Sequence, residues 1–236
     1  MIKPQQLSLG VSLNDEARFS NFYAPPATVN AQAADALRQQ IDLANEPFMY
    51  LWGASGAGLT HLLQAACHHA QSCGKHFQYF PLRDLTTYEP EELFAGLEQL
   101  DLVCLDNLDA VISNAEWQLA LFNLYNRLRD AGKYLVVAAQ MAPRELPLTL
   151  PDLASRLSWG VTFHVQSLDD LGKQHALRLR ARARGLELSD EVANFIIQRL
   201  PRDMNALFLQ LERLDQASLT EQRKLTIPFV KKILDV

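Results

Sequence analysis

The segment from residue 53 to residue 60 has the residue types and spacing of a phosphate-binding loop. It reads Gly53-Ala-Ser-Gly-Ala-Gly-Leu-Thr60, and the template is Gly, four residues, Gly, Lys and then Ser or Thr. Backbone N–H groups of such a loop point at phosphate oxygens, and the following helix adds the positive end of its dipole. Leu59 stands where the template has lysine, so we expect a nucleoside diphosphate to be held better than a triphosphate. The alternative is an ordinary glycine-rich turn between a strand and a helix. The expected phosphate-binding residues are Gly53, Ala54, Ser55, Gly56, Ala57, Gly58, Leu59, Thr60 and His61.

An acidic residue at the end of a later apolar segment would complete this site. The segment Leu-Val-Cys-Leu-Asp106 reads as a buried strand that ends in a carboxylate. In phosphate-loop proteins such an acid positions Mg²⁺, and the Thr60 hydroxyl would supply a further ligand. Asn107 follows, and an amide cannot act as the base for an attacking water. We therefore expect Mg²⁺ at Thr60 and Asp106 together with poor hydrolysis, the alternative being a strand that merely ends at a polar turn.

The elements that must position these residues alternate between apolar strands and amphipathic helices. Strands are expected at 48–52, 76–80, 102–106, 134–139 and 161–165, and helices at 31–44, 59–72, 91–100 and 117–129. Buried strands separated by helices indicate a parallel sheet covered on both faces, which is an α/β fold.

The charge balance and the periodicity both change near residue 168. Acidic residues outnumber basic ones before that point, and the balance reverses after it. The later part is expected to be entirely helical, with helices at 170–184, 189–200, 204–216 and 228–234, and Ser189 as an N-cap. We expect a tail at 1–16, a nucleotide-binding α/β domain at 17–167 and a helical lid domain at 168–236.

Composition excludes several classes of protein. The chain has 236 residues, of which 48% are hydrophobic and 21% charged, and this excludes global disorder. No apolar run reaches the roughly 18 residues that a membrane span needs, so no membrane partner is expected. The three cysteines, in apolar or helical settings, fit the reducing cytoplasm. A net charge of −5 disfavours a protein that coats DNA by bulk charge.

Further segments resemble motifs of the AAA+ ATPases, within the replication-initiator branch that includes DnaA. The segment that ends at Phe22 is similar to the initiators' stretch before the first helix, which helps hold adenine. Gln140 matches the polar position of the sensor 1 motif, and Arg156 matches the arginine finger in Pro-Asp-Leu-Ala-Ser-Arg-Leu-Ser-Trp-Gly. The segment Arg202-Asp-Met-Asn205 resembles the start of sensor 2.

This resemblance implies an AAA+ core with a five-stranded parallel sheet and a small C-terminal helical lid. It implies ADP with Mg²⁺ as the bound nucleotide, with contacts from Phe22, Gln140, Arg202 and Asn205. Asn205 departs from the pattern, because the family has an arginine there. Either Arg202 substitutes from one turn earlier, or the lid senses phosphate weakly.

Within this branch, the chain is similar to the Hda family of DnaA-related proteins that inactivate DnaA. It ends soon after the last expected helix, where the initiator continues into a DNA-binding domain, and only a short stretch precedes its core. The resemblance implies a negative regulator of replication initiation rather than an ATPase in its own right. Arg156 would enter the nucleotide site of ATP-bound DnaA and stimulate hydrolysis there, while a homodimer or higher oligomer stays open.

The tail contains Gln6-Leu7-Ser8-Leu9, which is similar to the short motif that docks bacterial proteins on the DNA polymerase III sliding clamp (the beta subunit). The Gln6 amide would form hydrogen bonds, and Leu7 and Leu9 would fill an apolar pocket. Contact with DNA would then be indirect, through the clamp. The alternative is a tail that packs against the core.

Several alternatives stay open at this point. The chain could be a phosphate-loop ATPase, or an AAA+ helicase-loading or DNA-remodelling module that acts as a homo-oligomer. Arg156 could pair with Asp152, one turn earlier on a helix. His69 and Cys73 share a helix face in a segment rich in histidine and cysteine, but the paired spacing of zinc motifs is missing there, so the sequence does not favour a metal site.

Overall fold

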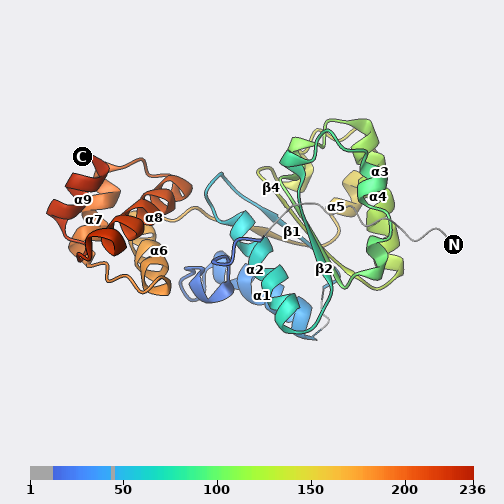
Figure 1. Ribbon diagram of the computed structural model, residues 1–236. Coiled ribbons are helices and arrows are strands. Elements are labelled where there is room, and N and C mark those ends of the chain that lie inside the picture. The colour runs from blue at the N-terminus through green and yellow to red at the C-terminus, as the bar shows by residue number, and fades with distance from the viewer. Residues whose placement is uncertain (1–12, 44–45) are drawn as a thin grey trace. The chain divides into compact units, whose positions relative to one another are not determined.

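The structure, a computed structural model, describes residues 13–43 and 46–236. The clamp-like segment Gln6-Leu7-Ser8-Leu9 lies outside the described residues. The chain divides into two compact units, shown in Figure 1. Of the described residues, 13–19 and those within Pro25–Gln166 belong to the first, and Ser20–Ala24 and Ser167–Val236 belong to the second.

The first unit is built on a parallel sheet of five strands in the order β2-β3-β4-β1-β5. The strands are β1 Phe48–Trp52, β2 Phe77–Pro81, β3 Leu102–Asp106, β4 Tyr134–Ala139 and β5 Val161–His164. The central strands are apolar and almost wholly buried, as a sheet covered on both faces requires. The predicted α/β class with five parallel strands is confirmed. Because all strands run the same way, the loops after β1, β3 and β4 leave from one edge.

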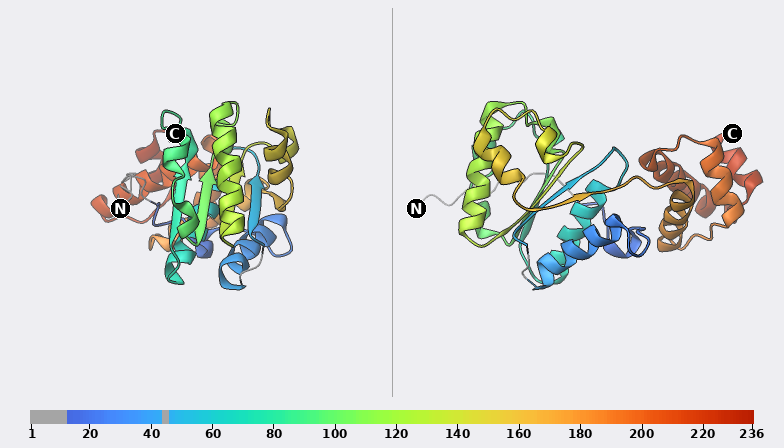
Figure 2. Two further views of the ribbon diagram at one scale, coloured as in Figure 1. Left: turned by 90° about the vertical axis from the view of Figure 1, so that its right-hand side faces the viewer. Right: turned by 180° about the vertical axis from the view of Figure 1, so that it is seen from behind.

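Helices cover both faces of this sheet. Figures 1 and 2 show α1 and α2 on one face and α3, α4 and α5 on the other. Their bounds are α1 Val29–Leu43, α2 Leu59–Ser72, α3 Pro90–Leu93, α4 Ala115–Asp130 and α5 Pro151–Leu157. Short 3₁₀ turns occur at Phe19–Asn21, Leu82–Asp84, Leu97–Gln99, Leu108–Ala110 and Pro143–Glu145.

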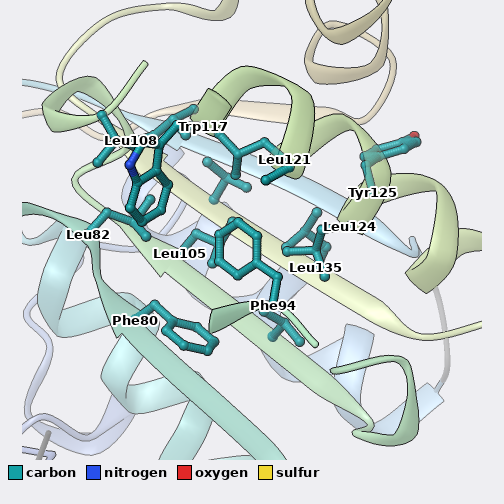
Figure 3. Close-up of a cluster of buried hydrophobic side chains, with 14 of the residues drawn as sticks. Phe80, Leu82, Phe94, Leu105, Leu108, Trp117, Leu121, Leu124, Tyr125 and Leu135 are labelled. Atoms are coloured by element: carbon teal, nitrogen blue, oxygen red, sulfur yellow. The ribbon is translucent and has the colours of Figure 1, made fainter. Parts of the chain in front are cut away.

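An apolar core joins the sheet to the helices of the α4 face (Figure 3). The Phe94 ring stands edge-on to both Phe80 and Trp117, with ring centroids 5.8 Å apart in each pair. Such aromatic pairs contribute about 0.5–1.5 kcal/mol beyond the area that they bury. This packing holds β3, and with it the acidic residue at its end, against a rigid layer.

The helix predicted at 91–100 is wrong. The helix α3 ends at Leu93, and Gly96 has a φ of 76°, which a right-handed helix does not allow. A 3₁₀ turn follows at Leu97–Gln99. The apolar spacing reflects two short pieces that bury Leu93 and Leu97 in the same core.

The second unit is helical apart from its connections. Its helices are α6 Asp170–Ala183, α7 Asp190–Arg199, α8 Met204–Glu221 and α9 Ile227–Leu234. The predicted N-cap is confirmed, because Ser189 Oγ accepts the Val192 N–H at 3.3 Å. Helix α8 runs five residues further than the predicted 204–216 and ends at Glu221, and Gln222 after it has the left-handed conformation. None of the described helices combines the length and apolar character that crossing a bilayer requires.

Candidate functional site

The glycine-rich loop leaves β1 at a point where no side chain fits. A Cβ on Gly53 would lie 2.3 Å from the Val165 carbonyl oxygen, far inside van der Waals contact. The Gly53 N–H donates to the Ala139 carbonyl at 3.3 Å, and the Val165 N–H donates to the Trp52 carbonyl at 2.7 Å. The loop is therefore fixed to the ends of both strands that flank β1.

The loop ends at Gly58, which caps α2. Its φ of 101° lies in the left-handed region, and no side chain bonds to the first turn of the helix. The first N–H groups of a helix have no carbonyl partner within it, and here they open onto the loop. The loop and the helix end therefore fit a phosphate group bound by main-chain donors. Leu59, the first helical residue, is half-buried and adds no charge.

Thr60 and the acidic residue after β3 meet as predicted. Thr60 Oγ1 donates to Asp106 Oδ2 at 2.6 Å, and the Asn107 N–H donates to Asp106 Oδ1 at 2.9 Å. Asp106 is only 1% exposed. Burial raises the pKa of Asp106, and the hydrogen bonds from Thr60, Tyr79 and Asn107 offset part of this rise. Oxygen donors from a hydroxyl and a carboxylate fit Mg²⁺, which prefers such ligands and retains several waters.

Sequence reasoning missed Tyr79, which belongs to this network. Its hydroxyl donates to Asp106 Oδ2 at 2.7 Å. Burial, and then the negative charge of Asp106, raise the pKa of Tyr79, so that the phenol keeps its proton and remains a donor. Only strand pairing could have revealed it, because β2 sets Tyr79 opposite Cys104, two residues before Asp106.

The backbone conformation after Asp106 favours asparagine at position 107. Asn107 has a φ of 58°, a left-handed conformation that asparagine tolerates better than most residues. The same edge of the sheet holds Gln140, whose side chain is exposed after β4. The Gln140 N–H donates to Asp109 Oδ1 at 3.0 Å, so this turn is tied to the loop after β3. Asp109 was not anticipated from the sequence.

His61 lies in the first turn of α2, next to the predicted metal ligand. Its Nε2 lies 2.9 Å from the Arg18 carbonyl oxygen in a hydrogen bond. This contact ties the chain before α1 to the helix that begins at the phosphate loop.

Arg156 lies on α5, a seven-residue helix that begins at Pro151. Its guanidinium lies 5.9 Å from the centroid of the Tyr125 ring on α4. Burial raises the pKa of Tyr125, and the Arg156 charge partly offsets that rise. Within residues 13–43 and 46–236 no ion pair joins Arg156 to Asp152, so that alternative is wrong. The aromatic face supports the guanidinium without neutralising its charge.

The turn after α5 is tightly constrained. A Cβ on Gly160 would lie 2.3 Å from the Phe48 ring and 2.5 Å from the Phe48 carbonyl oxygen. The start of β5 therefore packs directly on β1. Trp159, just before it, is 71% exposed.

Three predicted site residues belong to the second unit. Arg202 Nη1 lies 3.1 Å from Asp170 Oδ2 in an exposed ion pair. Asn205 is the second residue of α8 and is exposed, while Phe22 is half-buried in the short segment at 20–24. The structure thus brings the loop residues, Asp106 and Gln140 to one edge of the first unit. Phe22, Arg202 and Asn205 instead belong to the second unit.

Comparison with known families decides what this arrangement is. A family described as the bacterial DnaA ATPase domain matches residues 13–164, more than half of the chain. A family described as the lid domain of Hda matches residues 170–234. The chain belongs to the Hda family. It is a DnaA-related AAA+ protein of DNA replication regulation, and its AAA+ ATPase domain implies nucleotide binding.

Solved structures show the same fold. Domain III of the replication initiation protein DnaA from Thermotoga maritima superposes with a TM-score of 0.79 at 22% identity, over 95% of this chain and 98% of that one. AMPPCP-bound DnaA from Aquifex aeolicus gives 0.73 at 22% identity, over 89% and 68%. The RuvB Holliday junction branch migration motor of Thermotoga maritima gives 0.67 at 14% identity, over 92% and 73%. At these identities the likeness establishes the AAA+ fold of this Hda-family protein and nothing finer.

Proposed function

We propose that this Hda-family protein is a negative regulator of replication initiation that stimulates hydrolysis of the ATP bound to DnaA. Arg156 is the group that acts, as an arginine finger supplied in trans. A guanidinium beside the transferring phosphoryl group stabilises the charge of the transition state, an effect of about 10³–10⁵ in rate.

One observation carries this proposal. Among the described residues no carboxylate pairs with Arg156, whose guanidinium instead lies against the Tyr125 ring. An arginine that is oriented but not neutralised suits a role in a partner's site, because docking does not first have to break an ion pair. The constrained turn at Gly160 supports the position of α5.

The chain's own nucleotide has a different role in this proposal. We assign it as ADP with Mg²⁺, held by the backbone of residues 53–61, by Thr60 and Asp106, and by Phe22, Gln140, Arg202 and Asn205. Bound Mg²⁺ would neutralise charge on the diphosphate. Leu59 and Asn107 lack the cation and the base that hydrolysis needs, so the nucleotide stabilises the protein and is not turned over.

In this proposal, the tail brings the protein to its place of action. We propose that Gln6-Leu7-Ser8-Leu9 docks on the sliding clamp when the clamp is loaded on DNA in the cytoplasm. This part of the proposal depends on residue types alone, since the segment lies outside the described residues. A pull-down with clamp compares the wild type with the protein carrying Ala at positions 6, 7 and 9. Capture that persists in the altered protein would remove the tail from the mechanism.

The decisive experiment measures hydrolysis of labelled ATP on DnaA, with clamp and DNA present. Arg156→Ala should abolish the stimulation, while folding and clamp binding are retained. Arg129→Ala is the matched control, because Arg129 is an arginine on neighbouring α4 whose ion pair, among the described residues, is with its neighbour Asp130. Unchanged stimulation by Arg156→Ala would contradict the proposal.

A second candidate, an ATPase in its own right, is favoured by the intact bond between Thr60 and Asp106. Single-turnover hydrolysis by the isolated protein distinguishes the two. Rapid hydrolysis without DnaA supports the ATPase, and nucleotide-dependent ring assembly in a mass measurement supports a homo-oligomeric AAA+ module.

A further inference from the structure

Three side chains that ligate metals meet where the C-terminal ends of α1 and α2 lie together. They are Asp42, His69 and Cys73, and no other cluster of three or more histidine, cysteine or acidic side chains with this closeness occurs in the described part of the chain. Asp42 Oδ1 lies 2.8 Å from His69 Nε2. Cys73 Sγ lies 3.7 Å from Asp42 Oδ1 and 4.0 Å from His69 Nε2.

These separations match a tetrahedral zinc site closely. Zinc lies about 2.0–2.2 Å from nitrogen and oxygen ligands and about 2.3 Å from sulfur, which puts pairs of ligand atoms roughly 3.3–3.6 Å apart. The Asp42 to His69 contact must widen by a few tenths of an ångström, and Cys73 must move inward by a similar amount. Small side-chain rotations accomplish both changes.

Rigid neighbours hold the three ligands in place. His69 and Cys73 are one turn apart on α2, and the Cys73 N–H donates to the His69 and Ala70 carbonyls at 3.1 Å each. The Lys75 ammonium donates to the Ile41 carbonyl, which ties the end of α1, one residue before Asp42, to the chain after α2. Ligands on packed helices need little ordering when a metal binds.

An aromatic ring restricts the imidazole as well. The Phe19 ring stands edge-on to His69, with centroids 6.0 Å apart and planes at 74°. This contact limits rotation of the His69 ring while its Nε2 faces Asp42 and Cys73.

The electrostatic setting favours a cation. The last carbonyls of a helix carry a partial negative charge, and here the ends of two helices converge. Asp42 and Cys73 are exposed, so an ion can enter from solvent and keep water as its fourth ligand. The sequence disfavoured zinc here because the paired spacing of zinc motifs is missing around His69 and Cys73, and Asp42, which lies 27 residues before His69, was not considered.

The geometry points to a Zn²⁺ site formed by Asp42 Oδ1, His69 Nε2 and Cys73 Sγ. Binding displaces the thiol proton to solvent and leaves a thiolate on the metal, and the His69 ring must carry its proton on Nδ1 so that Nε2 can bind the ion. Thiolate and imidazole ligands select zinc over Mg²⁺, which the oxygen ligands of Thr60 and Asp106 suit instead. A bound ion would join α1 to α2, and this site is independent of the phosphate loop and of the proposed action on DnaA.

The test uses the full chain, stripped with a chelator and kept in excess Mg²⁺ so that the oxygen site is satisfied. Zn²⁺ titrated by calorimetry should bind with a stoichiometry of one. Co²⁺, used as a coloured substitute, should give a thiolate-to-metal charge-transfer band. That band reports Cys73, because Cys67 and Cys104 are buried.

Cys73→Ser should remove the band and weaken zinc binding by at least about tenfold, and Asp42→Asn and His69→Gln should also weaken it. His76→Gln is the control, because His76 is exposed just beyond α2 and faces Asp101 instead of the cluster. Zinc should raise the melting temperature of the wild type and of His76→Gln, but not of Cys73→Ser. Absence of stoichiometric binding, or equal affinity in Cys73→Ser, would overturn the assignment.

Discussion

In the proposed mechanism, the phosphate loop and helix α5 contribute different parts of the machinery of an AAA+ ATPase. The loop has the main-chain cradle that begins at Gly53, and the hydroxyl and carboxylate of Thr60 and Asp106 lie 2.6 Å apart. It lacks the charged groups that act on a terminal phosphate. Helix α5 presents such a charge, on Arg156. In the proposed mechanism, binding a nucleotide and hydrolysing one therefore depend on separable groups, which this chain would carry in different places.

The largest effect is expected at Arg156, where charge can be separated from geometry. Arg156→Lys keeps the positive charge but loses the planar fork that contacts phosphate oxygens in pairs. We expect the stimulated rate of DnaA-bound ATP hydrolysis to fall by about 10³-fold. Single-turnover hydrolysis with clamp and DNA measures it, and thermal melting verifies the fold. If Arg156→Lys is as active as the wild type, only the positive charge at position 156 is needed, and the planar fork of the guanidinium is not.

The next effect concerns the backbone cradle. Gly53→Ala puts a methyl group 2.3 Å from the Val165 carbonyl oxygen, so strands must shift. We expect the free energy of unfolding to fall by about 1–3 kcal/mol, and nucleotide affinity to fall with it. Urea denaturation measures the first and calorimetry the second.

Gly74→Ala provides the control for Gly53→Ala. Gly74 also resists substitution through its φ of 71°, but no atom lies within 4 Å of the added methyl group. The free energy of unfolding of Gly74→Ala should fall by about 1 kcal/mol because of backbone strain, and its nucleotide affinity should be unchanged. Equal losses of affinity in the two variants would show that the cradle itself is not the cause.

A smaller effect is expected from Tyr79→Phe, which removes one donor from buried Asp106. The pKa of Asp106, already raised by burial, should rise further, because hydrogen bonds from Tyr79 favour the ionised form. A carboxyl pKa that is higher in the folded state means that the native protein binds more protons, so stability falls as pH rises. The variant should therefore lose about 1–2 kcal/mol at neutral pH and less in acid. Urea denaturation between about pH 4 and 7 tests this, and a loss that does not depend on pH would contradict it.

Local signals predicted most of the nucleotide edge, and contacts between distant segments explain what they missed. The loop from Gly53 and the acid at 106 each follow one apolar strand, so a short window of sequence contains them. Tyr79 reaches Asp106 only because β2 pairs with β3, and Asp42 reaches His69 and Cys73 only because α1 packs on α2. The helix predicted around Gly96 was wrong because the apolar spacing there belongs to a short helix and a following 3₁₀ turn, not to one long helix.

The smallest effect is expected from a change at position 59, where the template of the phosphate loop has lysine. Leu59→Lys restores a cation at the first residue of α2 without altering the main chain. We expect the affinity for ATP, relative to ADP, to rise by about tenfold, or about 1.4 kcal/mol. Hydrolysis should stay slow, because Asn107 still cannot act as a base. Calorimetry with ADP and a non-hydrolysable ATP analogue measures the ratio, and Leu59→Met is the neutral control of similar volume. A ratio that is the same in both variants would mean that the shape of the loop, and not the missing charge, sets the preference between the nucleotides.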